Sequence, residues 1–333
     1  MIPINLYLAT STSCNVGCKT CPVGRKEFEP GGLMKLEMLK RIMDKCTKEA
    51  RVITVQLYHY NEPFLIPYLN EMVKMVHNYG IPVFLSSNLV IFKNVASVLA
   101  ENPETLLISV SGWTQEIYER SHKDGEIEKV KANMKEVARL KGPNTHVQVS
   151  WHKYRYNEHE EPLMQEFAES LGFQFVPYGT GLIPQDRAMK VWKTGVEDPA
   201  GEDTLVPVKD AQKLCFDRRN WPCILQTQIL PINGQGIVLN CSNRSDEANL
   251  RGSLFDTTVS EIFTKRKTDA ACKACQSVGA HIYATQAYTR SLYSPVRVAE
   301  DMYRKLGLAG RFPKFSAWAT RNLYLRPQKK KSI

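Results

Sequence analysis

The chain has 333 residues and a formal net charge of +10, with 43% hydrophobic and 23% charged residues, a composition typical of a globular enzyme. No run of 18 or more apolar residues is present, which excludes a hydrophobic transmembrane helix. The first residues, MIPINLYLAT, lack the basic start of a signal peptide, so we expect a cytoplasmic protein of one large domain or two smaller ones.

Short β-rich runs alternate with longer amphipathic stretches from residue 4 to residue 178. The expected strands are 4–10, 53–58, 82–87, 105–111, 146–151 and 173–178, and the expected helices include 34–46, 66–80, 126–140 and 161–172. Gly80 and Gly172 stand where a glycine commonly ends a helix. This alternation predicts an α/β fold of parallel βα units, in which the loops that follow the strands build the active site.

The chain has nine cysteines. Disulfides are rare in the cytoplasm, so clustered thiols in a cytoplasmic chain more often bind metal or act in catalysis. Cys14, Cys18 and Cys21 follow the first expected strand with the spacing C-x3-C-x2-C. Three thiolates are one ligand short of a structural zinc site. They can hold a four-iron cluster that keeps one iron open, and three buried structural cysteines are the alternative.

This cysteine motif, in the loop after strand one of a βα barrel, resembles the radical S-adenosylmethionine (radical SAM) superfamily. The resemblance implies a partial (β/α)6 barrel over residues 1–180 and a [4Fe–4S] cluster on Cys14, Cys18 and Cys21 that binds S-adenosylmethionine. In that family the bound S-adenosylmethionine is cleaved reductively to a 5′-deoxyadenosyl radical, which removes hydrogen from substrate. A flavodoxin- or ferredoxin-type reductant is implied as well. Thr20 departs from the aromatic residue that usually precedes the third cysteine.

Further segments match the family in chain order. Asn61-Glu62-Pro63 resembles the end of a Gly-Gly-Glu-Pro motif, with His59 and Tyr60 in place of the glycines. The match implies that Glu62 contacts the methionine ammonium, a charge-assisted hydrogen bond. The resemblance also implies that the S-adenosylmethionine pocket is lined by Asn88, Ser109 and Ser111, while the fifth expected strand offers His152, Lys153, Arg155 and Asn157 near the same rim. Taken alone, each of the two serines is more often an ordinary strand-end polar residue than a cofactor contact.

A second cysteine block comprises Cys223, Cys241, Cys272 and Cys275. The turn NGQG between two β-rich runs predicts a hairpin that brings residues 223 and 241 together, and a short helix is expected over 258–266. Four thiolates suit a [4Fe–4S] cluster or a zinc ion. Beside the radical SAM motif, the pattern resembles a Twitch domain, a short SPASM-like form, over residues 223–285. His281 and Thr285 stand where a full SPASM domain continues with cysteines, so one auxiliary cluster is implied.

Two cysteines belong to neither block. Cys215 lies in residues 181–222, a Pro-, Gly-, Asp- and Lys-rich stretch that we interpret as a bridging segment. As a catalytic hydrogen donor it would indicate an epimerase, whereas free cysteines are usually small buried apolar residues. Cys46 lies on the apolar face of an expected helix and is predicted to be a core residue.

The C-terminal tail, residues 286–333, is basic and aromatic. From residue 290 onward it holds eleven Lys or Arg and two acidic residues, and its end, RFPKFSAWATRNLYLRPQKKKSI, mixes basic residues with Phe312, Phe315, Trp318, Leu323, Tyr324 and Leu325. Such a segment suits an anionic membrane surface or a lipid-linked substrate. Nucleic acid is an alternative partner, and a packed terminal helix with a solvated basic end is another.

These observations predict a radical SAM oxidoreductase or epimerase that acts on a carbohydrate-like substrate, phosphorylated or lipid-linked. The first alternative is a radical SAM enzyme that modifies a peptide. Such members often carry a leader-binding domain before the cluster motif, and only 13 residues precede Cys14 here. The second alternative is a non-catalytic zinc-binding protein that contacts nucleic acid through its tail.

Overall fold

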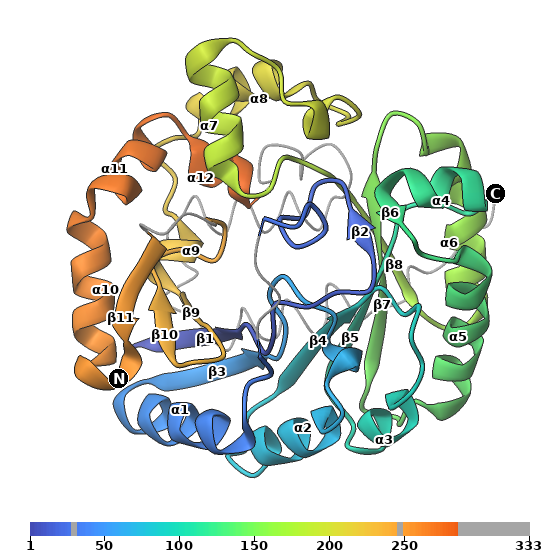
Figure 1. Cartoon of the computed structure of the whole chain (residues 1–333), viewed down its shortest axis with the longest axis horizontal. Helices are drawn as coiled ribbons and strands as arrows, with labels where there is room; N and C mark the ends of the chain where they lie inside the picture. The colour runs from blue at the N-terminus through green and yellow to red at the C-terminus, as the bar shows by residue number, and fades with distance from the viewer. Residues whose placement is uncertain (28–31, 245–248, 286–333) are drawn as a thin grey trace, which may run out of the picture.

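The computed structural model describes residues 1–27, 32–244 and 249–285 (Figure 1). The basic tail over 286–333, with the membrane and nucleic-acid hypotheses that rest on it, lies outside these residues. No helix of the described part of the chain is long and apolar enough to cross a bilayer.

A curved parallel sheet forms the centre of the molecule. Its strands are β1 (Pro3–Leu8), β3 (Arg51–Gln56), β4 (Val83–Ser87), β5 (Thr105–Val110), β7 (His146–Lys153) and β8 (Gln174–Gly179). They are neighbours in this order, and every adjacent pair is parallel. The expected α/β fold, a partial barrel of parallel strands, is confirmed, and each expected strand is present with its ends shifted by a few residues.

Helices cover the outer side of this sheet (Figure 1). They are α1 (Leu36–Glu49), α2 (Leu69–His77), α3 (Val95–Ala100), α4 (Gln115–Ser121), α5 (Ile127–Leu140) and α6 (Glu161–Ser170). Helix α5 shows why the helices pack on the sheet. It buries Ile127, Val130, Met134 and Val137, which are spaced three and four residues apart and so lie on one face. Along each strand, side chains alternate between the core beneath the helices and the opposite face of the sheet. Strand β5 buries Leu106, Ile108 and Val110 in the core beneath the helices and leaves Ser109 half-buried on its other face.

The predicted C-terminal hairpin is present and joins the barrel sheet. Strands β9 (Ile229–Ile232) and β10 (Ile237–Leu239) are antiparallel, and Gly236 in their turn has a positive φ of 78°. Strand β9 also pairs in parallel with β1, and β11 (Leu250–Ser253) pairs with β10. Within the described residues the sheet therefore has nine strands, in the order β11-β10-β9-β1-β3-β4-β5-β7-β8. The hairpin shares the main core with the barrel, which the sequence pattern did not predict.

The remaining helices lie in the bridging segment and the C-terminal part. They are α7 (Gln185–Thr194), α8 (Val208–Phe216), α9 (Ile224–Thr227), α10 (Val259–Thr268), α11 (Ala270–Ser277) and α12 (Ala280–Ala284). The helix expected over 258–266 is α10, which begins with a capping box of Thr258 and Glu261. Helices α7, α8 and α12 pack around a second hydrophobic cluster. The polar composition of residues 181–222 indicated a bridging segment but did not indicate helices α7 and α8, which lie within it.

Glu160 fixes the start of α4 from a distant part of the chain. Its side chain is 3% exposed, and its two oxygens accept hydrogen bonds from the Trp113 amide at 2.6 Å, the Thr114 amide at 3.2 and 3.3 Å, and the Thr114 hydroxyl at 2.6 Å. The Thr114 side chain makes no cap bond of its own. The carboxylate therefore takes the place of a local N-cap and favourably faces the helix N-terminus.

Replacing Glu160 by glutamine is expected to lower the free energy of unfolding by about 1–3 kcal/mol, because the new NH2 group would leave one of these buried donors without an acceptor. Urea denaturation monitored by circular dichroism checks this. Glu158, an exposed residue of the same short turn, supplies the control E158Q. Equal midpoints for E160Q and E158Q would refute the capping role.

Candidate functional site

The loop after β1 carries Cys14, Cys18 and Cys21 at the carboxyl edge of the parallel strands. It is held by a two-residue strand, β2 (Gly17–Cys18), which pairs with β6 (His122–Lys123). A Cβ atom on Gly24 would lie 2.4 Å from both the backbone nitrogen and the carbonyl oxygen of Cys18. Only glycine therefore allows the loop to close this tightly around the thiols.

The three front thiols are half-buried and lie close enough to influence one another's charge. Burial raises the pKa of Cys14 to about 11, and the charges of Glu62 and Cys21 contribute in the same direction. Burial likewise raises the pKa of Cys18 well above its ordinary value, with Cys21 and Cys14 adding to it. Thiolates gathered in this way repel one another without a cation between them, which fits a bound metal group.

Glu62 connects this loop to the end of β4. Its side chain is 2% exposed and accepts hydrogen bonds from the Ser87 hydroxyl at 2.8 Å, the Phe64 amide at 3.1 Å and the Asn88 amide at 2.8 Å. Its own amide donates to the Ser13 carbonyl at 3.0 Å. Burial raises the pKa of Glu62 to about 7, although the three donors oppose the rise. A buried carboxylate with a raised pKa is suited to receive a cation.

Asn88 lies between Glu62 and the first cysteine. Its side-chain amide is 3.6 Å from the Cys14 sulfur and donates to the Asn15 side-chain oxygen at 3.0 Å. The structure thus brings Cys14, Glu62 and Asn88 together, although they come from three different strand-end loops.

The serines of β5 differ in their surroundings. Ser109 is half-buried, with its hydroxyl 3.5 Å from that of Ser86. Ser111 is fully buried, and its hydroxyl is 3.1 Å from His152 Nδ1. The other nitrogen of His152 is hydrogen-bonded to the Tyr178 hydroxyl. Burial lowers the pKa of His152 to about 4, so the ring is neutral at physiological pH.

The other polar residues at and after the carboxyl end of β7 contact neighbouring segments of the chain. Lys153 forms an ion pair with Glu161 at 2.8 Å, and Arg155 donates to the Glu202 carbonyl. Asn157 is fully buried and donates to the carbonyls of Ser111 and His152, each at 2.8 Å.

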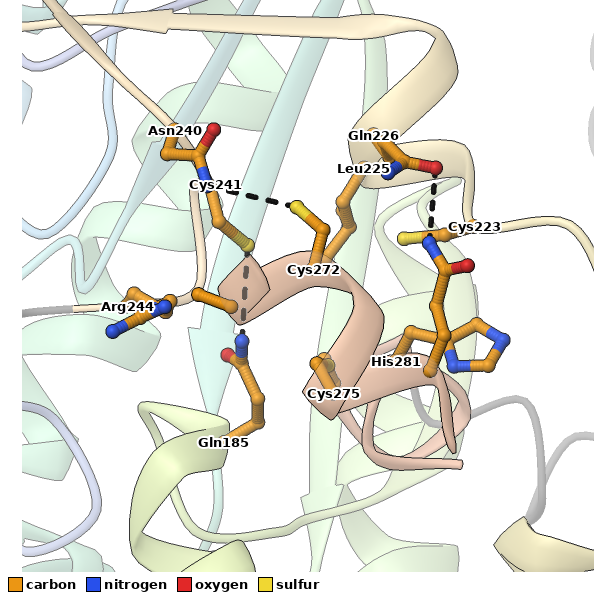
Figure 2. Close-up of a pocket in the computed structure, with 13 residues that line it drawn as sticks. Gln185, Cys223, Leu225, Gln226, Asn240, Cys241, Arg244, Cys272, Cys275 and His281 are labelled. Carbon is orange, nitrogen blue, oxygen red and sulfur yellow. Dashed lines mark hydrogen bonds between the residues drawn. The ribbon is translucent and has the colours of Figure 1, made fainter. Parts of the chain in front are cut away.

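The four C-terminal thiols line one cavity (Figure 2). Cys223 precedes α9, Cys241 follows β10, and Cys272 and Cys275 lie on α11. Burial raises the pKa of Cys223 to about 12, with the charge of Cys241 adding to it. Burial also raises the pKa of Cys275, and the other three thiols of the set add to that rise. The structure therefore gathers the predicted four cysteines at a single place.

Side-chain amides surround these sulfurs. Asn240 Nδ2 lies 3.6 Å from the Cys272 sulfur and Gln185 Nε2 lies 3.8 Å from the Cys241 sulfur (Figure 2). The backbone amide of Asn243 donates to Cys241 at 3.3 Å. Hydrogen-bond donors around a thiolate are typical of metal centres. Sequence reasoning missed both side chains. Asn240 directly precedes a predicted ligand, but Gln185 lies 56 residues from Cys241 and carries no local signal.

Arg266 gives a further test of whether the four-thiol cavity suits an anionic centre. Its side chain is 2% exposed, and Nε has no hydrogen-bond partner among the described residues. The charges of Cys241, Cys272 and Cys223 favour its protonated form. A buried cation requires a nearby negative charge, and four thiolates around a metal group supply one. The four cavity thiols therefore fit a metal centre with several thiolate ligands, such as an iron–sulfur cluster. Across the described parts of the chain, no three His, Cys, Asp or Glu side chains converge closely enough for a single metal ion.

The segment 59–61 connects the two thiol sites. His59 Nε2 and the Tyr60 hydroxyl both contact the Ser242 carbonyl, at 2.5 and 2.9 Å, and Ser242 follows Cys241. Asn61 Nδ2 donates to Thr10 Oγ1 at 3.0 Å, in the segment that leads to Cys14. His59 and Tyr60 thus hold the loop of the second site against the loop of the first.

The two remaining cysteines lie in hydrophobic cores. Cys46 is fully buried in the main core, as predicted. Cys215 is fully buried in the second cluster with Leu182 and Val191, and burial raises its pKa to about 12. A hydrogen donor must contact its substrate, whereas this thiol is 0% exposed and lines neither site. Its placement favours a packing role over the catalytic role considered from the sequence.

Comparison with known proteins gives the same fold. A family model described as the Radical SAM superfamily matches residues 8–166. The solved structures that resemble the chain include BtrN in complex with AdoMet and 2-DOIA (13% identity, TM-score 0.50, 84% of this chain and 89% of BtrN). Native anSMEcpe with bound AdoMet is another, with 16% identity, a TM-score of 0.54, and coverage of 86% of this chain and 96% of anSMEcpe. A third is Streptococcus suis SuiB bound to S-adenosylmethionine, with 11% identity, a TM-score of 0.55, and coverage of 84% of this chain and 71% of SuiB. At these identities the likeness is one of fold. No curated protein sequence matches the chain.

Proposed function

We propose that the chain, whose residues 8–166 match the radical SAM superfamily model, is an oxidoreductase or epimerase that removes hydrogen from a carbohydrate-like substrate. Cys14, Cys18 and Cys21 would hold a [4Fe–4S] cluster. When bound, this cluster and S-adenosylmethionine supply the 5′-deoxyadenosyl radical on which the family's chemistry depends.

The residues around Cys14 would bind the amino-acid part of S-adenosylmethionine. Glu62 holds a buried negative charge beside Cys14, and its Oε2 atom accepts only the Asn88 amide among the hydrogen bonds described. A carboxylate oxygen can accept a second bond, so Glu62 has capacity for the methionine ammonium. Asn88 and Ser109 present polar groups from the next two strand ends. Ser111 would act by orienting His152, because its own hydroxyl is buried.

The substrate class is inferred from the face of the sheet that the helices do not cover. Along the strands this face carries mainly hydroxyl, amide and imidazole groups, contributed by Tyr7, Gln56, Tyr58, Ser86, Ser109, Gln148 and His152. Such groups both donate and accept hydrogen bonds, and they suit a ligand rich in hydroxyl groups better than an apolar one.

One observation supports oxidation in particular, namely that segment 59–61 fixes the four-thiol cavity against the front loop. An alcohol carbon that has lost a hydrogen atom must lose one more electron and a proton to become a carbonyl. Cys223, Cys241, Cys272 and Cys275 would hold an auxiliary [4Fe–4S] cluster, which would supply an acceptor for that electron. Epimerisation needs a hydrogen donor instead, and the burial of Cys215 gives that outcome no support.

The proposal is tested by finding which compounds stimulate 5′-deoxyadenosine release from the reduced, reconstituted enzyme. Fractions of sugars, sugar phosphates, lipids, peptides and RNA would be compared with flavodoxin as the electron source. We expect a hydroxyl-rich fraction to stimulate release above the uncoupled background. Stimulation by a peptide fraction alone would overturn the carbohydrate proposal.

Peptide modification is the second candidate. It is favoured by the fold likeness to SuiB bound to precursor peptide SuiA (TM-score 0.55) and to anSMEcpe with bound Cp18Cys peptide (TM-score 0.56). Those ligands are properties of those proteins, and the same screen distinguishes the two candidates.

A further inference from the structure

Arg266 is a cation that the fold buries at the C-terminal end of α10. Its neighbours Lys265 and Lys267 are exposed, as basic residues in the last turn of a surface helix usually are, whereas the Arg266 side chain is 2% exposed. It points inward beside Phe263, whose ring centroid is 5.1 Å from the guanidinium carbon. Burial of an arginine is rare and requires compensation.

No carboxylate supplies that compensation in the described residues. The guanidinium donates to the carbonyls of Ile229 and Leu239, each at 2.6 Å, which lie on the two strands of the hairpin. Its Nε has no hydrogen-bond partner among the residues that the structure describes. Asp269, three residues further on, pairs instead with Arg251 at 2.5 Å. Two carbonyl dipoles satisfy part of the hydrogen-bonding capacity but do not neutralise the charge.

The cavity thiols would supply negative charge once they bind a metal group as thiolates. Burial lowers the pKa of Arg266 to about 10, and Cys241, Cys272 and Cys223, when charged, oppose that lowering. Arg266 itself does not line the cavity; it lies behind the hairpin end that carries Cys241, with its hydrogen bond to Leu239 two residues before that cysteine. The cation therefore acts on the cavity through protein of low dielectric, where charge interactions are strong.

We propose that Arg266 is the built-in counter-charge of the auxiliary cluster and raises its reduction potential. This inference rests on the proposed function, because it requires that the four thiols hold an iron–sulfur cluster. Gain of one electron makes such a centre more negative by one charge. A fixed cation close by stabilises that more negative state, so net charge and burial together set the potential. A raised potential suits an electron acceptor for substrate oxidation.

The experiment compares Arg266→Gln and Arg266→Met, which remove the charge, with Arg266→Lys, which keeps it. Lys267→Gln is the matched control, since it removes the same charge from the next, exposed position. After anaerobic reconstitution, iron is counted and the midpoint potential of each cluster is measured by redox titration followed by electron paramagnetic resonance. We expect the neutral variants to lower one midpoint potential only, with R266K and K267Q close to the unmodified protein.

Each outcome has a defined meaning. An unchanged midpoint in iron-replete R266Q and R266M would overturn the inference. Loss of about four irons in both neutral variants, with retention in R266K, would support the counter-charge role, whereas loss in all three would show a packing role and overturn it. An unmodified protein that binds only about four irons would refute the auxiliary cluster itself, which separates failure of the proposed function from failure of this inference.

Discussion

Replacement of Cys14 by alanine is expected to reduce 5′-deoxyadenosine formation to background. Cys14 is one of only three thiols in the front loop, so its loss leaves two ligands where the fold offers no local substitute among the described residues. Its sulfur is also the one that Asn88 contacts and on whose charge Glu62 acts, so its loss would disturb the proposed cluster ligand and the proposed cofactor-binding residues together. Chromatography of the reduced reaction mixture measures the nucleoside.

Iron content separates a lost ligand from a misfolded chain. C14A should retain about four irons through the C-terminal thiols, compared with about eight in the unmodified protein. Cys46→Ala removes a cysteine from the main core without touching either site, and it should keep both the iron and the activity. Formation of 5′-deoxyadenosine by C14A at the unmodified rate would refute the assignment of the front loop.

The features that sequence reasoning predicted are those encoded locally. The alternation of buried and half-buried residues along β5 is visible in Leu106, Ile108 and Val110 with Thr105 and Ser109 at the alternate positions, and only Leu107 interrupts the pattern of apolar and polar residues. The C-x3-C-x2-C loop is contiguous, and a strand end places it at the sheet edge without further information. The hairpin was predicted because its turn requires a glycine with positive φ, and Gly236 supplies it.

The features that were missed depend on contacts between distant segments. No local pattern in Ile229–Ile232 indicates that β9 pairs with β1, because a buried parallel strand and a buried hairpin strand have the same apolar composition. Helices α7 and α8 each bury only three residues, several of them small or polar, so their apolar faces are narrow in the sequence. Arg266 resembles any basic residue in a last helical turn, and only the tertiary structure shows that it is buried.

Attachment of the hairpin to β1 has a consequence for the chemistry. The front cysteines follow β1 directly, and Cys241 follows β10, which pairs with β9 beside β1. The front cysteines and Cys241 therefore follow strands of one sheet, and these strands contribute to one hydrophobic core. His59 and Tyr60 add a second connection at the rim. A common frame of this kind keeps the two thiol sites at a fixed separation, which a flexibly linked domain could not do.

Replacement of Cys272 by alanine is expected to abolish product formation while S-adenosylmethionine cleavage continues at a measurable, uncoupled rate. Cys272 lies at the start of α11, where its amide donates to Asp269 and its sulfur faces Asn240. Its removal opens the four-thiol site and leaves the β1 loop intact. If the second site accepts the electron that substrate oxidation releases, hydrogen abstraction will still occur but the oxidised product will not accumulate.

The matched control is Cys215→Ala, which removes a buried cysteine from the neighbouring cluster outside the four-thiol cavity. It should retain about eight irons and full coupling between cleavage and product. Normal turnover by C272A would show that the second site takes no part in electron transfer, and the reaction would then have to be redox-neutral. Loss of product in C215A, with its iron intact, would restore the hydrogen-donor role of that thiol and favour epimerisation. The ratio of product to 5′-deoxyadenosine in these two variants therefore separates oxidation from epimerisation by a single measurement.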